Sequence, residues 1–373
     1  MIAVDFTPDA FLAQEFGGVS RCFAELARTL HTTCTTSGVV PTIHAAIHGN
    51  AHLRALSRAH GDGLVRGRWL PIKGDMRTVA IHVPRLLYAR RLRRAPPQLV
   101  HDTGYALVAR GSCTVPTLIT VHDMIREADP RAISSRSKGD EEKRAAIARA
   151  TCIVVPSTST RDALIRIERV DPARVQVIHH GARLPSPSAT HPLGGHRYFL
   201  HVGPRKRYKD FLTAMRAFAR LKREGFHGRF VTVSRRALSG EERMYATHLG
   251  LTPHDVVVRS ADDEGLATLY AHALAFVFPS QAEGFGIPIL EAMSLGCPVV
   301  CMRAPGSEEA AGGAALLSGP GDDAELALHM SRVASDPAIR EDLIARGYAR
   351  ARHCSWERAA IQYTHLVRSI MGR

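Results

Sequence analysis

Short apolar runs alternate with amphipathic stretches along most of the chain. Runs such as "ALAFVFP" at 273–279 are rich in residues that favour β-strands, and the stretches between such runs repeat apolar residues at the period of a helix. Strands that alternate with helices form parallel sheets with helices on both faces. The pattern therefore predicts an α/β protein.

The alternation occurs twice, with an irregular segment between the two series. The segment "GARLPSPSATHPLGGH", residues 181–196, contains three prolines and three glycines and has no periodicity, so it is typical of an interdomain linker. Two doubly wound domains are therefore expected. The strands are predicted at 2–6, 39–47, 99–101, 116–121, 152–155 and 175–178, and then at 198–202, 230–233, 256–258, 275–278 and 298–301. The helices are predicted at 19–30, 84–94, 138–150 and 158–167, and then at 210–222, 240–249, 263–271 and 288–295.

Composition narrows the class of protein. The 373 residues are 45% hydrophobic and 23% charged, as in globular proteins. No run approaches the roughly 18 apolar residues of a membrane span, and Asp5 interrupts the start before the core of a secretory signal could form. We therefore expect a cytoplasmic protein. Seven cysteines without a C-x-x-C pair argue against a disulfide framework and a structural zinc site. We expect Cys22, Cys152, Cys297 and Cys301 to be buried free thiols.

Positive charge is concentrated in the first half. Residues 1–182 contain 25 Lys and Arg against 16 Asp and Glu, which gives them +9 of the net +14. The densest cluster is "RLLYARRLRR", Arg85 to Arg94, where Leu86, Leu87 and Leu92 are predicted on one side of a helix and five arginines on the other. This helix face is either simply solvated or bound to anionic lipid headgroups at a membrane surface. Nucleic acid is not expected as a partner, because no nucleic-acid-binding motif accompanies the charge.

Two acids follow the strand predicted at 275–278. In "SQAEGFGIPILEAMSLGCPVV", Glu283 precedes a Gly-Phe-Gly turn, and Glu291 lies within the helix expected from Pro288. Glycines let the backbone approach a ligand, and free amides at a helix start bind phosphate or sugar oxygens. A carboxylate one turn into the helix fits a pair of vicinal hydroxyls. Alternatively, both acids only complement the positive end of the helix.

A basic loop follows the strand predicted at 198–202. The segment "HVGPRKRYKDF" places Arg205, Lys206, Arg207 and Lys209 after the turn at Gly203. Cations crowded at the carboxyl end of a strand repel one another unless an anion joins them, and a diphosphate would serve. The alternative is a basic loop in solvent.

These segments, together with "VHDMIRE" at 121–127, resemble the retaining glycosyltransferases of family 4. The similarity runs from "GGVSRCFAEL" to the terminal "WERAAIQYTHLV". It implies the GT-B fold, in which two Rossmann-like domains face a central cleft. The domains would then be 1–182 and 197–355, joined by the linker 183–196. A C-terminal helix, 356–373, would return to the first domain.

The resemblance also implies roles for residues of the second domain. Glu283 would contact the hydroxyls of the donor sugar, and Glu291 would bind the ribose of the nucleotide. Arg205 and Lys209 would hold the diphosphate and stabilise the leaving group. The backbone of Gly284, Phe285 and Gly286 would assist in binding the donor.

In the first domain, Gly17 and Gly18 match the glycine loop of the family beside the donor phosphate. His122 matches its histidine near the transferred sugar, with a catalytic role. The dipeptide His-Asp occurs at His101-Asp102 and again at His122-Asp123, each time after an apolar run, so both pairs are expected on the rim of the cleft. His101 and Asp123 are therefore candidates for contacts with the acceptor, although an ordinary structural role is an equal alternative for His101.

The chain departs from the pattern of the family after the strand predicted at 230–233. The sequence there is "VTVSRRALSGEE" instead of a glycine-rich turn, so Ser234, Arg235 and Arg236 are expected either to contact the donor or to narrow the base pocket. The identity of the nucleotide therefore stays open.

No Asp-x-Asp motif occurs, so the usual carboxylate site for a metal-bound nucleotide sugar is absent from the sequence. We therefore expect no metal and no other cofactor, because the basic loop and the helix start would neutralise the leaving diphosphate. The resemblance implies a nucleotide-sugar donor, with GDP-mannose as the best candidate, and a glycan or lipid-linked acceptor. A peripheral position on the inner face of the membrane would fit such an acceptor.

Four other functions are alternatives to this one. A non-catalytic relative could bind the nucleotide sugar without turnover, and an epimerase or sugar phosphorylase could use the same fold. An NAD-dependent oxidoreductase is disfavoured, because no G-x-G-x-x-G follows the first strand.

Overall fold

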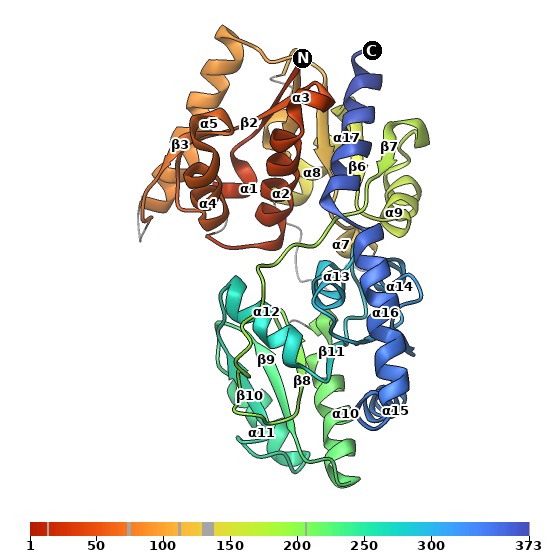
Figure 1. The fold of residues 1–373 in the computed structure, drawn as a ribbon. Helices are drawn as coiled ribbons and strands as arrows, with labels where there is room; N and C mark the ends of the chain where they lie inside the picture. Colours follow the sequence, from red (N-terminus) through yellow and green to blue (C-terminus); the bar gives the residue numbers. More distant parts are fainter. Residues whose placement is uncertain (13–14, 73–75, 111–112, 129–137, 206, 373) are drawn as a thin grey trace. The chain divides into compact units, whose positions relative to one another are not determined.

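The computed structural model describes residues 1–372 apart from 13–14, 73–75, 111–112, 129–137 and 206. It divides the chain into two compact units (Figure 1). The N-terminal unit comprises Met1–His180 and Trp356–Arg373, and the C-terminal unit comprises Gly181–Ser355. Each unit contains one parallel sheet covered by helices, so the predicted α/β class and its two doubly wound domains are confirmed.

The N-terminal unit has a sheet with the strand order β3-β2-β1-β4-β5-β6-β7, in which every neighbouring pair is parallel. The chain builds the sheet outward from β1 in one direction and then from β4 in the other. Loops after these strands therefore gather at the point where the order reverses, which is where such sheets bind ligands. The strands are β1 (Ile2–Phe6), β2 (Val39–His48), β3 (Val65–Trp69), β4 (Leu99–Asp102), β5 (Thr117–Thr120), β6 (Cys152–Val155) and β7 (Val175–Val177).

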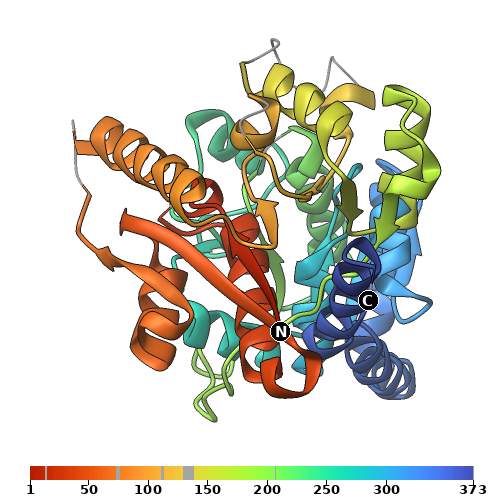
Figure 2. The same ribbon diagram turned by 90° about the horizontal axis from the view of Figure 1, so that it is seen from above.

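The helices of this unit include both long covering helices and single turns. They are α1 (Asp9–Leu12), α2 (Gly18–Thr32), α3 (Cys34–Ser37), α4 (Ala51–His60), α5 (Met76–Arg94), α6 (Ala106–Ala109), α7 (Ile125–Ala128), α8 (Lys138–Arg149), α9 (Thr158–Glu168) and α17 (Trp356–Ile370). The last of these comes from the end of the chain and packs against α2 (Figures 1 and 2). It places Tyr363 in the core, where the phenol lies 3.0 Å from Nδ1 of His101.

The C-terminal unit has the strand order β10-β9-β8-β11-β12-β13, again entirely parallel. This is the 3-2-1-4-5-6 order of a dinucleotide-binding fold, and its switch point lies between β8 and β11. The strands are β8 (Tyr198–Val202), β9 (Arg229–Val233), β10 (Val256–Arg259), β11 (Ala275–Phe278), β12 (Val299–Met302) and β13 (Leu316–Ser318). The helices are α10 (Phe211–Arg223), α11 (Gly240–His248), α12 (Asp263–His272), α13 (Ile287–Ser294), α14 (Pro305–Ala311), α15 (Asp323–Ser335) and α16 (Pro337–His353).

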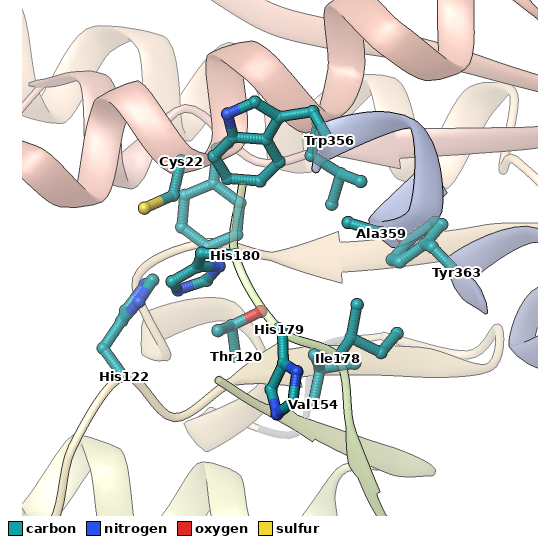
Figure 3. A pocket seen from close by; sticks show the side chains of 12 residues that line it. Cys22, Thr120, His122, Val154, Ile178, His179, His180, Trp356, Ala359 and Tyr363 are labelled. Atoms are coloured by element: carbon teal, nitrogen blue, oxygen red, sulfur yellow. The ribbon is translucent and has the colours of Figure 1, made fainter. Parts of the chain in front are cut away.

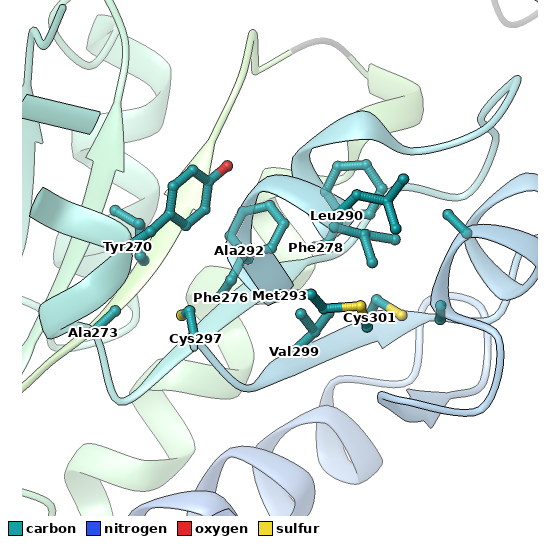
Figure 4. Close-up of a cluster of buried hydrophobic side chains, with 14 of the residues drawn as sticks. Tyr270, Ala273, Phe276, Phe278, Leu290, Ala292, Met293, Cys297, Val299 and Cys301 are labelled. Atoms are coloured by element: carbon teal, nitrogen blue, oxygen red, sulfur yellow. The ribbon is translucent and has the colours of Figure 1, made fainter. Parts of the chain in front are cut away.

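A buried cluster of aromatic, aliphatic and sulfur-containing side chains fixes α13 against this sheet (Figure 4). Phe276 and Phe278 of β11 pack with ring centroids 5.5 Å apart, and Tyr270 of α12 packs edge-on to Phe276. Leu290 and Met293 cover them from α13. The cluster therefore fixes the helix that follows the Glu283 loop. The four thiols predicted to be buried and free, Cys22, Cys152, Cys297 and Cys301, are so.

Several elements were not predicted from the sequence. The edge strand β3 has the sequence "VRGRW", in which only Val65 is fully buried, so its apolar signal is weak. The other unpredicted elements are α1, α3, α4, α6, α7, α14, α15, α16 and β13. The helix predicted to begin at Pro84 begins at Met76 instead and contains Pro84.

The predicted faces of α5 are wrong. Leu86 and Leu87 are 51% and 43% exposed, and only Leu92 of the three leucines is buried. Arg85 and Arg91 point inward, with Nε of Arg85 2.6 Å from Asp9 and Nη1 of Arg91 3.1 Å from Asp5. The buried carboxylates of Asp5 and Asp9 require positively charged partners. The arginines that meet this requirement turn inward, so leucines and arginines do not lie on opposite sides of the helix. The exposed face of α5 therefore combines leucines and arginines: Leu86, Leu87, Arg90, Arg93 and Arg94.

In the described part of the chain, none of the helices combines the length and apolar character that a membrane-spanning segment requires.

The contact between α17 and β4 yields a test of stability. Tyr363→Phe leaves Nδ1 of the fully buried His101 without its partner, so the free energy of unfolding should fall by about 1–3 kcal/mol. Chemical denaturation monitored by circular dichroism measures the change. Tyr348→Phe, which alters an exposed tyrosine of the C-terminal unit, should have almost no effect. An unchanged denaturation midpoint for Tyr363→Phe would contradict the assignment.

Candidate functional site

Two loops meet at the switch point of the C-terminal sheet. The pairing of Phe199 with Ala275 sets β8 and β11 side by side, so the segments after Val202 and Phe278 leave the same edge. The backbone N–H of Gln281 donates to the carbonyl of Tyr208 at 2.9 Å. The side-chain amide of Gln281 donates to the carboxylate of Asp210 at 2.6 Å. The basic loop and the Glu283 loop are therefore one structural element.

Arg205 is held in place by carboxylate and carbonyl groups. Its Nε donates to Glu242 at 2.8 Å, and its Nη2 donates to the carbonyls of Arg236 and Ala237. Its Nη1 is buried without a hydrogen-bond partner among the described atoms. A buried guanidinium nitrogen in this state is costly and suits an anion. The expectation that these cations must repel until an anion arrives is wrong for Arg205, because Glu242 already balances its charge.

Lys209 is paired as well. Its Nζ lies 2.5 Å from Oε1 of Glu283, and both side chains are mostly buried. This contact joins the two residues that the sequence assigned to the diphosphate and to the donor sugar. Arg207 is exposed, and Lys206 lies outside the described residues.

The Glu283 loop is shaped by two glycines. A Cβ on Gly306, in the first turn of α14, would lie 2.3 Å from the carbonyl oxygen of Glu283, so only glycine fits there. Gly286 has φ +124° and precedes α13, a conformation that other residues rarely adopt. The side chain of Phe285 belongs to the hydrophobic core. Any contact between Phe285 and a donor must therefore come from its backbone.

Glu291 is a buried carboxylate, only 5% exposed. The phenol of Tyr270 donates to its Oε2 at 3.5 Å. It lies beyond the first turn of α13, which contains no acid, so the alternative that it complements the helix end is weak. A carboxylate at this place can accept hydrogen bonds from a ligand that carries hydroxyl groups.

In the N-terminal unit, Gly17 caps the start of α2, and Gly18 begins it. A Cβ on Gly18 would have no atom within 4 Å, so space is open beside this helix start. An N-terminus with open space can accept an anion. The role of the glycine pair beside a donor phosphate stays a prediction.

His122 follows β5 and lines a small pocket with Cys22, Thr120, His180 and Trp356 (Figure 3). Burial lowers the pKa of His122 to about 4, so its imidazole is neutral at physiological pH. Its Nε2 is buried without a hydrogen-bond partner among the described atoms. The next residue, Asp123, accepts from the backbone N–H of Ile125 at 3.2 Å and so shapes the turn into α7.

The expected place of His101 on an accessible rim is wrong. Its side chain is completely buried, and its two ring nitrogens lie 3.0 Å from the phenol of Tyr363 and 2.9 Å from Oγ1 of Thr120. Burial lowers the pKa of His101 to about 3. The reason is that α17 covers the carboxyl end of β4. His101 therefore supports the fold and cannot touch an acceptor.

Sequence reasoning missed several residues around these loops. Glu242 binds Arg205 and also completes a capping box with Ser239 at the start of α11. The pattern Ser-x-x-Glu in "SGEE" could have predicted the cap, although not the contact with Arg205. No local pattern in the sequence would have predicted the contact of Tyr270 with Glu291. The same holds for Cys22 and His180, which line the pocket of His122 in the N-terminal unit. Each contact arises from packing between elements distant in sequence.

Comparisons with known proteins agree with this geometry. The model for Glycosyltransferase Family 4 matches residues 16–184, and the model for Glycosyl transferases group 1 matches residues 188–350. Sucrose-phosphate synthase from Thermosynechococcus elongatus superimposes with a TM-score of 0.76 at 19% identity, over 100% of both chains. HepE of Anabaena, solved in complex with UDP and glucose, gives 0.75 at 18% identity over 99% of this chain and 100% of its own.

Curated relatives add their names. The O-antigen chain mannosyltransferase B of Escherichia coli is 46% identical over 27% of this chain and 26% of its own length. The MMP alpha-(1->4)-mannosyltransferase of Mycolicibacterium hassiacum is 28% identical over 80% of this chain and 76% of its own. The O-antigen chain mannosyltransferase RfbU of Salmonella typhimurium is 24% identical over 58% and 62%. The match thus spans about a quarter of the first relative's length.

The two parallel sheets, the loops at the switch point and the paired domain matches define a glycosyltransferase with the GT-B fold. The curated relatives named above are mannosyltransferases.

The contact at Gly306 yields a test of the site. Gly306→Ala should displace the Glu283 loop and lower the free energy of unfolding by about 1–3 kcal/mol, because the added methyl group overlaps the backbone of Glu283. Transfer activity should fall with it. Thermal unfolding and initial rates measure both effects. Gly240→Ala is the control, since its nearest atom would be 3.9 Å away. A fully active, equally stable Gly306→Ala protein would argue against the proposed rigidity of the loop.

Proposed function

We propose that this enzyme transfers mannose from GDP-mannose to a glycan or lipid-linked hydroxyl, with retention of the anomeric configuration and without a metal ion. The observation that carries the proposal is the joined pair of loops at the switch point of the C-terminal sheet. They hold two partly buried cations, Arg205 and Lys209, and the partly buried Glu283, and they lead to the buried Glu291 of α13. Cations for phosphates and carboxylates for hydroxyls are what a nucleotide diphosphate sugar requires. Names of mannosyltransferases among the relatives support the choice of sugar.

The diphosphate is assigned to Arg205 and Lys209. The unpaired Nη1 of Arg205 offers a charge-assisted hydrogen bond that no described protein group uses. The ion pair with Glu283 holds Lys209 in position before the donor binds. Negative charge on the diphosphate grows as the glycosidic bond breaks, so both cations stabilise the transition state more than the ground state.

The sugar and the nucleoside are assigned to the two carboxylates. Glu283 accepts hydrogen bonds from hydroxyls of the donor sugar, and Glu291 accepts two from the ribose. The backbone of Gly284, Phe285 and Gly286 adds donors to the same ligand. Arg235 and Arg236 follow β9 in the same unit, and we assign them to the edge of the base pocket.

The N-terminal unit supplies the acceptor side. The neutral imidazole of His122 can hydrogen-bond to the transferred sugar without repelling positive charge that develops at its anomeric carbon. We assign Gly17 and Gly18, at the start of α2, to an anionic group of a substrate, because backbone amides at a helix start bind anions. The acceptor hydroxyl attacks on the face of the leaving group, and an oxygen of the departing diphosphate takes its proton. No protein nucleophile is needed.

Product analysis tests the reaction. With GDP-mannose and a mannose-terminated acceptor, the product should retain the α configuration of the donor, as seen by NMR, and excess chelator should not lower the rate. Preference for another sugar nucleotide in the same screen would correct the donor. An inverted product, or strict dependence on magnesium, would contradict the mechanism. Binding of donors without any transfer would indicate the non-catalytic alternative.

A substitution tests the ribose assignment. Glu291→Gln keeps the size of the side chain but removes its charge, so the affinity for GDP should fall by about 1.5–3 kcal/mol, roughly 10- to 150-fold. Isothermal titration calorimetry measures the loss. Glu264→Gln, at an exposed position on α12, is the matched control and should bind GDP normally. Unchanged GDP affinity in Glu291→Gln would remove Glu291 from the site.

We further propose that the acceptor is met at an anionic membrane surface. The exposed face of α5 supports this, because it combines Leu86 and Leu87 with Arg90, Arg93 and Arg94. Leucines enter the interface while arginines contact anionic headgroups, and each arginine contributes about 1 kcal/mol. Binding should be weak and reversible.

Co-sedimentation with phosphatidylserine-containing vesicles tests this membrane contact. The wild type should pellet at low salt and dissociate near 1 M salt, where the Debye length falls to about 3 Å. Changing Arg90, Arg93 and Arg94 to Gln should abolish pelleting. Arg66→Gln and Arg68→Gln are controls that remove exposed positive charge from β3 instead. A wild-type protein that stays in the supernatant at low salt would show that α5 is a solvated face.

A further inference from the structure

Three potential metal ligands surround the small pocket of the N-terminal unit. Cys22 comes from α2, His122 follows β5, and His180 follows β7 (Figure 3). One ligand atom from each residue lies within 4.8 Å of the other two. The pocket between them has a volume of about 20 Å³, enough for a single ion or water molecule.

The donor atoms define the class of metal. One sulfur and two imidazole nitrogens suit zinc, whereas magnesium and calcium require oxygen ligands. Tetrahedral zinc at its usual bond lengths holds such atoms roughly 3.4–3.6 Å apart. The three ligand atoms, now within 4.8 Å of one another, would therefore have to move about 1 Å closer together to bind an ion. The fourth position is left for water or another small ligand.

The surrounding side chains hold both imidazoles in place. The ring of Phe23 packs edge-on against His122 with centroids 5.5 Å apart, and the ring of Trp356 packs against His180 at 5.7 Å. The two imidazoles lie 5.7 Å apart. Nε2 of His122 is buried and accepts no hydrogen bond from any described group. A metal ion would bind this nitrogen, which otherwise is buried away from water without a polar partner.

We propose that Cys22, His122 and His180 form a zinc site. Zinc binds the thiolate of Cys22, whose proton is released to solvent, and one nitrogen of each imidazole. The ion thereby occupies Nε2 of His122, so zinc inhibits the transferase. The inhibition rests on the proposed role of His122, but metal binding does not. Zinc regulates the transfer reaction and takes no part in its chemistry.

Cobalt titration into the metal-free protein tests the site without donor or acceptor. The wild type should bind one Co²⁺ per chain and show a thiolate-to-cobalt charge-transfer band in the near ultraviolet. Cys22→Ser should lose the band, and His180→Gln should bind Co²⁺ at least about tenfold more weakly. Cys34→Ser and His179→Ala are matched controls and should keep both. Circular dichroism checks that each variant is folded.

The results of these experiments distinguish zinc binding from inhibition of the transferase. A wild-type protein without the band, or a band that survives in Cys22→Ser, overturns the zinc site. Where the site is present, zinc should inhibit mannosyl transfer by the wild type and lose at least about tenfold of its potency against His180→Gln. Equal transfer rates with and without bound zinc would overturn both the inhibition and the role of His122. The cobalt spectrum would in that case still establish the metal site.

Discussion

The parallel pairing of β8 with β11 is the constraint on which the donor site depends. The chain crosses from β8 to β9 and β10 on one side of the sheet and returns to begin β11 on the other. Only at this boundary do two loops leave adjacent strands without a covering helix between them. Hydrogen bonds from Gln281 to Tyr208 and Asp210 then join the loops. Residues 74 positions apart, Lys209 and Glu283, become direct partners.

Charge balance follows from that arrangement. Buried cations and carboxylates are tolerated only when they are paired and hydrogen-bonded. Arg205 meets Glu242, and Lys209 meets Glu283, so the loops are stable without a ligand. In the proposed function, a donor diphosphate would add partners to groups that are already oriented, which would lower the entropic cost of binding.

In the N-terminal unit, the carboxyl ends of the strands are packed differently. Here α17 returns from the end of the chain and seals β4, with Tyr363 and Thr120 on the two nitrogens of His101. His122, one strand further along the sheet, keeps an unused nitrogen beside a pocket. Two His-Asp dipeptides with similar local sequence thus have different surroundings, because both ring nitrogens of His101 have partners in the core and Nε2 of His122 has none among the described atoms.

The sequence by itself determined the α/β class, the two domains, the loops that carry Arg205, Lys209 and Glu283, and the helix that carries Glu291. Periodicity and glycine positions report local backbone preferences, and those preferences survive folding here. Tertiary structure decided what local pattern cannot encode. It buried His101, turned Arg85 and Arg91 toward Asp9 and Asp5, and brought Cys22 to His122 and His180. Each of these outcomes depends on contacts between elements far apart in sequence, where burial and charge pairing outweigh local periodicity.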